Sequence, residues 1–498
     1  MTKSYEQLME YIDKVMAFQA ALTLFEWDAE TLAPEESMNY TAKTIGILSN
    51  EYFTNLINED VKALISKLSE ENLSVRENAI VKQIKKSYDE MELIPPKEYQ
   101  AFKELTAKAS GIWAKAKKNQ NFAEYAPVLD EIITYQKKFA GYRAKANENP
   151  YDILLNDFEE GFNTKTLDIF FDKIKKAVIP LLKEVTKKEA SIDKAYNYQD
   201  YDVTKQKEFC NFLSEYVGFD KAKGVIAESA HPFTMQIHNH DVRITNHFHT
   251  NNLESAIFSI IHESGHGIYE MNIDDDLTQT PVGGGTSMGM HESQSRFFEN
   301  IIGRSESFWL PIYDKLRETY SEQLKDITLE HFIKGINKSK PSLIRTEADE
   351  LSYPLHVIIR YEIEKMIFNN EITTDELPKV WNQKYEEYLG ITPPNDAVGV
   401  LQDIHWAGGS FGYFPSYAIG SAIAAQIYYH MAFVMPFDQY LKDGNLSPIR
   451  EYLKEHIHRF GGIKNTNEIL KDMMQEELNA DYYVKYLTEK YTKLYGLD

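Results

Sequence analysis

Helical periodicity of apolar residues dominates the chain. Apolar positions recur at intervals of three and four residues with Lys and Glu between them, which is the pattern of a helix buried along one face. X-Pro and Asn-rich segments at 92–99 and 147–152 interrupt this run, as turns do. The spacing predicts helices over the stretches 2–25, 37–69, 73–92, 97–118, 122–145, 164–189, 205–216, 306–328, 346–370, 374–389, 416–436, 448–458 and 466–494.

One stretch departs from this periodicity. Residues 231–250, HPFTMQIHNHDVRITNHFHT, alternate β-branched or aromatic side chains with polar ones, which is typical of short antiparallel strands. The sequence has no internal repeat and no Gly/Ser- or Pro-rich linker that would mark a domain boundary. We therefore expect a mainly α fold, a single large helical body over 1–498 with a small antiparallel β-sheet near its middle.

Composition and charge exclude several classes of function. The 498 residues are 43% hydrophobic and 26% charged, which supplies enough apolar material for a large core. A formal charge of −22 disfavours nucleic acid and membrane surfaces as partners. The single cysteine, Cys210, fits a reducing compartment. Since the N-terminal pattern is amphipathic and no apolar run approaches ~18 residues, we expect a cytoplasmic protein without a signal peptide or membrane span.

The strongest chemical signal is the HExxH pattern HESGH at 262–266. Histidines four positions apart lie about 40° apart around a helix, so His262 and His266 can reach one ion while Glu263 faces its bound water. Asn251, with a Glu three residues on, is the expected N-cap, and an apolar stripe predicts that the helix is buried. Since buried histidines without partners are costly, we favour metal ligands over two hydrogen-bonded core histidines.

The third ligand separates the subclasses of zinc peptidase. A metzincin would have Gly and His where this chain has Tyr269 and Asn272, so that class is excluded. Glu270 lies on the same helical stripe, but about 12 Å along the axis from His262, which is too far to share a tetrahedral ion. A carboxylate from another element is therefore required.

The candidate carboxylates follow the Gly-rich loop 283–289, which leads into a helix starting near His291. Glu292 is the first acidic residue of this helix, which would face the HExxH helix. Glu299, seven positions on and on the same face, is either the alternative ligand or a partner behind the ligands. We favour Glu292. A His2Glu set leaves one position open for water, and Glu263 would then accept the water's proton and pass it to the leaving group of a peptide bond.

Six motifs, all present in order, make the chain resemble the M32 metallocarboxypeptidases of the thermostable carboxypeptidase 1 type. The motifs are HPF (231–233), DVRIT (241–245), HESGH (262–266), HESQ (291–294), IRTEAD (344–349) and GVLQDIHW (399–406). The resemblance implies a gluzincin-like single peptidase domain and a cytosolic homodimer with a deep groove between helical walls. The catalytic motifs would lie within 231–420, and we expect residues 1–150 to form a helical lid.

The resemblance also implies an activity and a cofactor. The protein would release single amino acids from the C-termini of peptide substrates, with one Zn²⁺ or Co²⁺ per chain. It carries over His262, His266 and Glu292 as ligands and Glu263 as the general base and acid, the same residues that the spacing indicates.

An exopeptidase also needs a cation for the terminal carboxylate of its substrate, and Arg binds carboxylates through two parallel hydrogen bonds. The candidates are Arg345 of IRTEAD and Arg243 of DVRIT. As alternatives, Arg243 pairs with Asp241, and Arg345 pairs with Asp349 one helical turn on. We favour Arg345 as the substrate-binding residue. His231 of HPF either lines a substrate subsite or caps the strand.

The tetrahedral intermediate needs hydrogen-bond donors aimed at its oxyanion. Residues 403–420 offer His405, Tyr413 and Tyr417 beside a Gly-rich turn. This stretch is similar in pattern to related gluzincins, in which a His followed by Tyr residues performs this task. His405 is the stronger candidate, because among 32 tyrosines any given one is ordinary.

Four further histidines, at 238, 240, 247 and 249, raise the alternative of a second metal site. Alternation along a strand would place 238 with 240, and 247 with 249, on shared faces, and we favour a role for them as groove walls.

Two rival functions accompany the carboxypeptidase. The first is an oligopeptidase or dipeptidyl carboxypeptidase on the same scaffold, without the carboxylate clamp close to the metal. The second is a catalytically silent helical peptide-binding protein with a structural metal. Glu263 weighs against the second, because a structural site has no use for a carboxylate beside an open coordination position.

Overall fold

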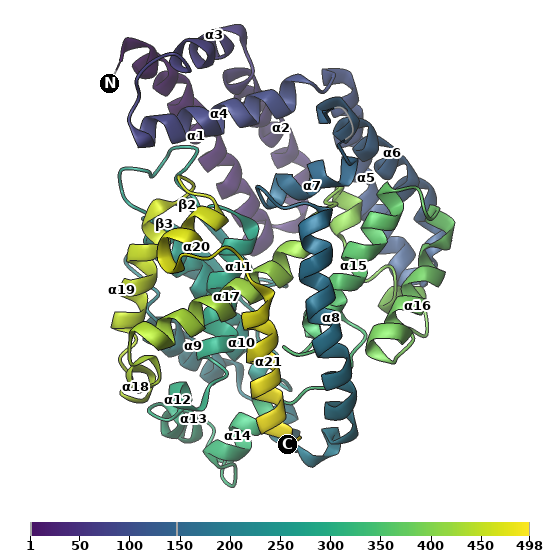
Figure 1. Cartoon of the computed structure of the whole chain (residues 1–498), viewed down its shortest axis with the longest axis vertical. Helices are drawn as coiled ribbons and strands as arrows, with labels where there is room; N and C mark the ends of the chain where they lie inside the picture. Colours follow the sequence, from purple (N-terminus) through teal and green to yellow (C-terminus); the bar gives the residue numbers. More distant parts are fainter. Residues whose placement is uncertain (1, 146–147, 498) are drawn as a thin grey trace. The chain divides into compact units, whose positions relative to one another are not determined.

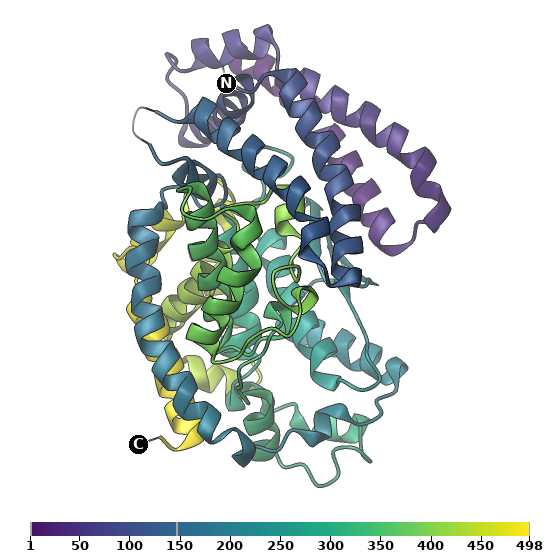
Figure 2. The same cartoon turned by 90° about the vertical axis from the view of Figure 1, so that its right-hand side faces the viewer.

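The computed structural model describes residues 2–145 and 148–497 and is built mainly from helices (Figures 1 and 2). The predicted mainly α class with one small sheet is confirmed. None of the helices in the described residues has the length and apolar character needed to cross a membrane.

The chain forms two compact units, each made from three separate segments. Unit 1 comprises residues 1–92, 194–332 and 430–477, and unit 2 comprises residues 93–193, 333–429 and 478–498. The stretch 1–150 is therefore divided between the units at residue 92, and its role as a lid stays a prediction.

Unit 1 carries the sheet and most of the shorter helices. Its helices are α1 (Lys3–Thr31), α2 (Met38–Leu56), α3 (Glu59–Leu68), α4 (Val75–Glu92), α9 (Val203–Val217), α10 (Leu253–Met271), α11 (Met288–Arg296), α12 (Glu306–Trp309), α13 (Tyr313–Thr319), α18 (Phe437–Lys442), α19 (Ser447–His456) and α20 (Thr466–Met474). Apolar positions at helical spacing on α1, α3 and α4 form one buried cluster. Its members include Tyr5, Leu8, Ile12, Val15, Val61, Ile65, Leu68, Ile80, Ile84 and Tyr88.

Unit 2 is assembled around long helices. Its helices are α5 (Pro96–Asn119), α6 (Ala126–Arg143), α7 (Pro150–Phe158), α8 (Thr164–Lys187), α15 (Tyr353–Phe368), α16 (Leu377–Leu389) and α21 (Ala480–Tyr495). Both α14 (Leu329–Ile336) and α17 (Pro415–Val434) contain a boundary between the units. The helices α8 and α21 lie side by side although far apart in sequence (Figures 1 and 2), and Lys173 Nζ lies 2.9 Å from Asp481 Oδ1 between them.

The sheet has three strands in the order β1-β3-β2. β2 (Thr234–His238) and β3 (Asp241–Asn246) pair antiparallel, as the alternation at 231–250 predicts. β1 (Gly224–Glu228) pairs parallel with β3, so the sheet is mixed and the prediction of a purely antiparallel sheet is wrong in this respect. The strand β1 is five residues long and largely half-exposed, and it therefore lacks the alternation by which a strand is predicted.

Several predicted helices are wrong in their boundaries. The stretch 37–69 is two helices, because the Asn58 side chain accepts a hydrogen bond from Val61 N–H and starts α3 there. The stretch 466–494 is interrupted at Gln475, which has a φ of 60° in the left-handed region. The stretch 306–328 contains two short helices, and 346–370 begins as a helix only at Tyr353. The segment 147–152, predicted as a turn, contains the start of α7.

Candidate active site

Helix α10, which carries the HExxH sequence, starts one residue later than predicted. The side chain of Asn252 accepts a hydrogen bond from the N–H of Ser255 at 3.3 Å, so the N-cap is Asn252 and not Asn251. The side chain of Asn197 accepts a second one from the N–H of Glu254 at 2.8 Å. These two side chains satisfy first-turn donors that have no partner within the helix.

The helices α10 and α11 approach each other closely at Gly265. A Cβ atom at this position would lie 2.8 Å from the carbonyl oxygen of Gln294 and 2.8 Å from Cα of Ser295. No side chain fits in that space without moving one helix. The glycine of HESGH therefore permits the packing that brings α10 and α11 together.

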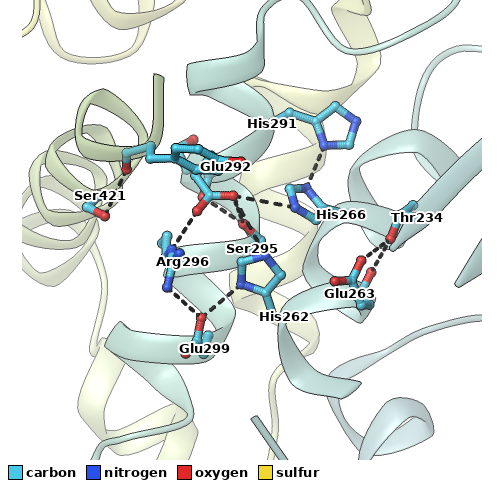
Figure 3. Close-up of polar contacts among 12 residues, drawn as sticks. Thr234, His262, Glu263, His266, His291, Glu292, Ser295, Arg296, Glu299 and Ser421 are labelled. Atoms are coloured by element: carbon cyan, nitrogen blue, oxygen red, sulfur yellow. Dashed lines mark hydrogen bonds and ion pairs between the residues drawn. The ribbon is translucent and has the colours of Figure 1, made fainter. Parts of the chain in front are cut away.

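This packing brings the three predicted ligands to one point. Figure 3 shows His262 and His266 of α10 facing Glu292 of α11. Glu292 Oε2 lies 3.7 Å from His262 Nε2 and 3.6 Å from His266 Nε2, and one ligand atom from each residue lies within 4.8 Å of the others. Ligands at ordinary zinc distances in a tetrahedral site lie about 3.4 Å apart. The three side chains therefore fit one divalent metal ion of the kind that His2Glu sets hold.

Glu299 lies behind this group rather than in it. Its Oε2 is 2.8 Å from His262 Nδ1, the ring nitrogen that does not face Glu292 (Figure 3). Arg296 donates to both carboxylates, with Nε 2.6 Å from Glu292 Oε1 and Nη1 3.1 Å from Glu299 Oε2. Arg304 Nη2 donates to Glu299 Oε1 at 3.3 Å. The predicted alternative role of Glu299, as a partner behind the ligands, matches this geometry.

The protonation of Glu292 and His266 suits metal binding; burial alone would lower the pKa of His262 too, but Glu292 and Glu299 beside it raise that pKa. Burial alone would raise the pKa of Glu292, but Arg296 and His262 beside it hold that pKa well below its usual range. Burial lowers the pKa of His266 to about 3, so this imidazole is neutral near neutral pH. An ionised carboxylate and a neutral imidazole are the forms that bind metals.

The carboxylate of Glu263, which follows His262 on α10, is held in place from the sheet. Thr234 Oγ1, at the start of β2, donates to Glu263 Oε2 at 2.6 Å (Figure 3). Burial raises the pKa of Glu263 above its usual value. A raised pKa brings a carboxylate closer to the range in which it can both accept and return a proton.

Glu270 is not placed as a ligand, in agreement with the distance argument. Its Oε1 accepts a hydrogen bond from the N–H of Gly285 at 3.0 Å and lies 2.6 Å from His291 Nε2. His291 Nδ1 in turn lies 2.6 Å from His266 Nδ1. The Gly-rich loop and the helix that follows it therefore contribute a second set of contacts behind the histidines.

The two candidate arginines differ in how their guanidinium groups are occupied. Arg243 makes a two-point contact with Asp241, with Nε–Oδ1 and Nη2–Oδ2 both 2.9 Å. Arg345 Nε donates to Asp403 Oδ1 at 2.9 Å and Nη1 donates to Tyr353 Oη at 3.2 Å. Pairing of Arg243 with Asp241 is thus present. Pairing of Arg345 with Asp349 is wrong, because the helix containing Arg345 ends at residue 347.

Asp403 is shared between two arginines of unit 2. Its Oδ2 accepts from Arg360 Nε at 2.7 Å, while its Oδ1 accepts from Arg345. Burial alone would raise the pKa of Asp403, but Arg360 and Arg345 hold it well below its usual range. A single carboxylate therefore faces two buried guanidinium groups.

The predicted oxyanion donors form an aromatic group in unit 2. His405 Nε2 lies 3.2 Å from Tyr417 Oη, and the His405 and Tyr413 rings have centroids 5.5 Å apart. Burial, together with Arg345, lowers the pKa of His405 to about 4. The imidazole is therefore neutral near neutral pH and offers one N–H donor. His231, in contrast, is exposed, and its predicted role stays a prediction.

The remaining histidines are not grouped as a second metal site would require, within the described part of the chain. Among the residues that the structure describes, no further group of three His, Cys, Asp or Glu side chains comes close enough to hold an ion. The predicted strand faces are also wrong, because β2 ends at His238 and β3 covers only 241–246. His240 contacts Asp275 at 2.7 Å, and His247 contacts Ser255 at 2.6 Å.

Several contributors to these clusters were not predicted from the sequence as site residues; they include Thr234, His291, Arg296, Arg304, Arg360 and Asp403. Arg296 offered a signal, since it lies one helical turn after Glu292 on the same face. His291 and Asp403 lie within the motifs HESQ and GVLQDIHW. Thr234 follows HPF directly, but nothing in the sequence indicates its contact with Glu263.

Comparison with known proteins finds relatives that match nearly the whole chain. The family model for carboxypeptidase Taq (M32) metallopeptidase matches residues 7–491. Carboxypeptidase 1 of Bacillus subtilis is 44% identical over 498 residues, covering 99% of each chain. Thermostable carboxypeptidase 1 of Pyrococcus furiosus is 34% identical, covering 98% of each chain. The crystal structure of the M32 carboxypeptidase from Deinococcus radiodurans matches with a TM-score of 0.96 and 29% identity, covering 99% of this chain and 100% of that one. The chain therefore belongs to the carboxypeptidase Taq (M32) family of metallopeptidases, as a metal-dependent carboxypeptidase.

Proposed function

We propose that this protein removes single amino acids from the C-termini of peptides, with broad specificity and with one divalent metal held by His262, His266 and Glu292. The observation that carries the proposal is the convergence of two Nε2 atoms and one Oε2 atom beside the buried carboxylate of Glu263. The donor set of two imidazoles and one carboxylate suits zinc, with cobalt as the alternative.

Glu263 performs the proton transfers in this proposal. A metal bound at the site would polarise the scissile carbonyl and make a water molecule more acidic. Glu263 accepts a proton from the water while the water oxygen attacks the carbonyl carbon of the peptide bond. Glu263 then delivers this proton to the amine nitrogen as the C–N bond breaks. The hydrogen bond from Thr234 Oγ1 fixes one oxygen of this carboxylate and so limits the orientations that it can take.

Arg345 and His405 take the two remaining roles. We assign the substrate's terminal carboxylate to Arg345, because the two-point contact of Arg243 with Asp241 already uses the fork of that arginine. The neutral imidazole of His405, with Tyr417 and Tyr413 beside it, is the proposed donor to the oxyanion. His231 is proposed as a subsite residue.

The test compares an N-blocked dipeptide with its C-terminally amidated twin. Each is offered to enzyme stripped with a chelator and then reloaded with zinc or cobalt. Metal-restored release from the free acid alone is the expected result. Equal cleavage of both would favour the alternative, an oligopeptidase or dipeptidyl carboxypeptidase. If neither peptide is cleaved in a metal-dependent way, the remaining alternative is a catalytically silent peptide-binding protein.

We further propose that the enzyme acts as a cytoplasmic homodimer. The resemblance to the family is the support for this assembly, and light scattering of the purified protein tests it. A mass twice that of the chain is expected, and a monomer at micromolar concentration would contradict it.

A further inference from the structure

The two histidines on α10 are supported from behind in different ways. His262 Nδ1 meets a carboxylate directly, since Glu299 Oε2 lies 2.8 Å away. His266 Nδ1 meets a second imidazole, since His291 Nδ1 lies 2.6 Å away, and the carboxylate of Glu270 comes only after it. A ligand histidine almost always donates its outer N–H to a carboxylate, a carbonyl or water. An imidazole in that place is therefore a departure that needs an explanation.

The hydrogens of this chain of contacts can be placed in one consistent way. A metal on His266 Nε2 requires that nitrogen to be bare, so the ring hydrogen lies on Nδ1. His266 Nδ1–H then donates to His291 Nδ1, which must carry no hydrogen. The hydrogen of His291 therefore lies on Nε2, where it donates to Glu270 Oε1 at 2.6 Å. Each short contact then has one donor and one acceptor.

The surroundings of His291 hold its ring in this position. A Cβ atom on Gly285 would lie 2.7 Å from His291 Cδ2 and 2.8 Å from Tyr269 Cε1, so only glycine lets the loop close over the ring. The N–H of Gly285 donates to Glu270 Oε1 at 3.0 Å. The Tyr269 ring lies against His291, with centroids 5.2 Å apart. The Gly-rich loop thus encloses the imidazole and its carboxylate together.

We propose that His291 is a positioning residue for the metal site: its Nδ1 accepts the N–H of His266, fixes the tautomer of that ligand and aims its Nε2 at the metal. Glu270 fixes the tautomer of His291 in the same manner. The inference rests on the proposed function in one respect, which is that His266 binds the metal through Nε2. It does not require His291 to touch substrate or metal.

The test measures zinc affinity of the full-length protein by competition with a chromophoric chelator, on metal-free protein prepared by chelation. Two substitutions separate hydrogen bonding from packing. His291→Asn is smaller, but its amide oxygen can stand where Nδ1 stands. His291→Phe keeps the shape of the ring and removes both nitrogens. Loss of such an outer partner typically weakens metal binding about 10- to 100-fold.

We expect His291→Phe to weaken zinc binding by about 10- to 100-fold and His291→Asn to retain most of the parent's affinity. A purely packing role predicts the opposite order of zinc affinities. A zinc affinity of His291→Phe equal to or higher than that of His291→Asn therefore overturns the proposal. Thermal unfolding of each metal-free variant serves as the fold control. If one fails to fold, Gly285→Ala, which displaces the ring without changing it, is expected to weaken zinc binding, and unchanged affinity there also overturns the proposal.

A ligand control separates this inference from the proposed function. His266→Ala is expected to lose far more affinity than either His291 variant. If His266→Ala binds zinc as the parent does, the proposed ligand set is wrong and the inference falls with it. If His266→Ala loses zinc while His291→Phe does not, only the inference about His291 is overturned.

Discussion

The two units each bury a cluster of charged side chains, and the clusters differ in the sign of their surplus charge. The cluster in unit 1 contains four buried carboxylates and two arginines. The carboxylates are Glu263, Glu270, Glu292 and Glu299, and the arginines are Arg296 and Arg304. In unit 2, Asp403 is paired with both Arg345 and Arg360, and burial raises the pKa of the neighbouring Glu364 to about 7. A buried charge without a partner is costly. The first cluster therefore suits a divalent cation and the second suits an anion such as the carboxylate of a peptide.

The difference in charge between the two clusters predicts two different roles, one in metal binding and chemistry and the other in recognition of the C-terminal carboxylate. Substitutions in the first cluster should change metal binding or chemistry, whatever end the peptide presents. Substitutions in the second should change the preference for a free C-terminal carboxylate and leave the metal untouched.

The largest effect is expected within the first cluster, between two glutamates given the same substitution. Glu263→Gln removes the proposed proton acceptor, so kcat should fall about 10²- to 10⁴-fold with zinc affinity unchanged. Glu292→Gln removes the charge of a ligand, so zinc affinity itself should fall. Steady-state kinetics with zinc titrations of both variants check this. Loss of zinc binding by Glu263→Gln would mean that Glu263 is a metal ligand and not the proton acceptor.

A pH effect is expected next, from His405 in the second unit. Its folded pKa, lowered by burial to about 4, lies below the unfolded value of 6.5. Between these values the unfolded chain binds a proton that the folded chain does not, so stability falls as the pH falls from 6.5 to about 4. The full loss is about 3 kcal/mol. Urea unfolding across this range should show that His405→Gln loses less stability than the parent, and parallel curves for the two proteins would argue against the lowered pKa.

The sequence predicted the parts of this molecule that depend on local spacing. The long amphipathic helices and the paired strands β2 and β3 follow from periodicity, and the convergence of His262 and His266 follows from an i, i+4 interval. Helix breaks were missed where one residue decides them, such as the left-handed Gln475. Strand β1 was missed because its pairing with β3 is set by tertiary contacts and not by its own pattern.

For the candidate site too, the sequence predicted the residues but not the contacts that hold them. Glu292 could be inferred as the first acidic residue on a helix expected to face α10, whereas the packing at Gly265 that makes the helices meet is visible only in three dimensions. The pairing of Arg345 with Asp403 joins residues 58 positions apart, and no local rule connects them. Local spacing therefore indicated which residues come together at the candidate site, while the partners that hold them are visible only in the fold.

A smaller effect is expected from the arginines, for which the chain offers a matched pair. Arg345→Gln should lower kcat/KM for a free-acid dipeptide about 10- to 100-fold, because a charge-assisted hydrogen bond to the substrate is lost. Zinc affinity should not change. Arg243→Gln, whose guanidinium is already bound to Asp241, should have a much smaller effect. A larger loss for Arg243→Gln than for Arg345→Gln would reverse the assignment of the carboxylate clamp.

The smallest effect is expected at Glu299, and it tests how the negative surplus of the first cluster is distributed. Glu299→Gln keeps an oxygen that can accept the N–H of His262, but it removes the charge that Arg296 and Arg304 face. Zinc binding should therefore weaken by about 10-fold, at the lower end for an outer partner of a ligand. Chelator competition measures this, with thermal unfolding of the metal-free variant as the control for folding. A loss as large as that of Glu292→Gln would instead place Glu299 among the ligands. A loss of the expected size would mean that the charge of Glu299 contributes to zinc binding beyond its hydrogen bond to His262, but contributes less than the charge of Glu292.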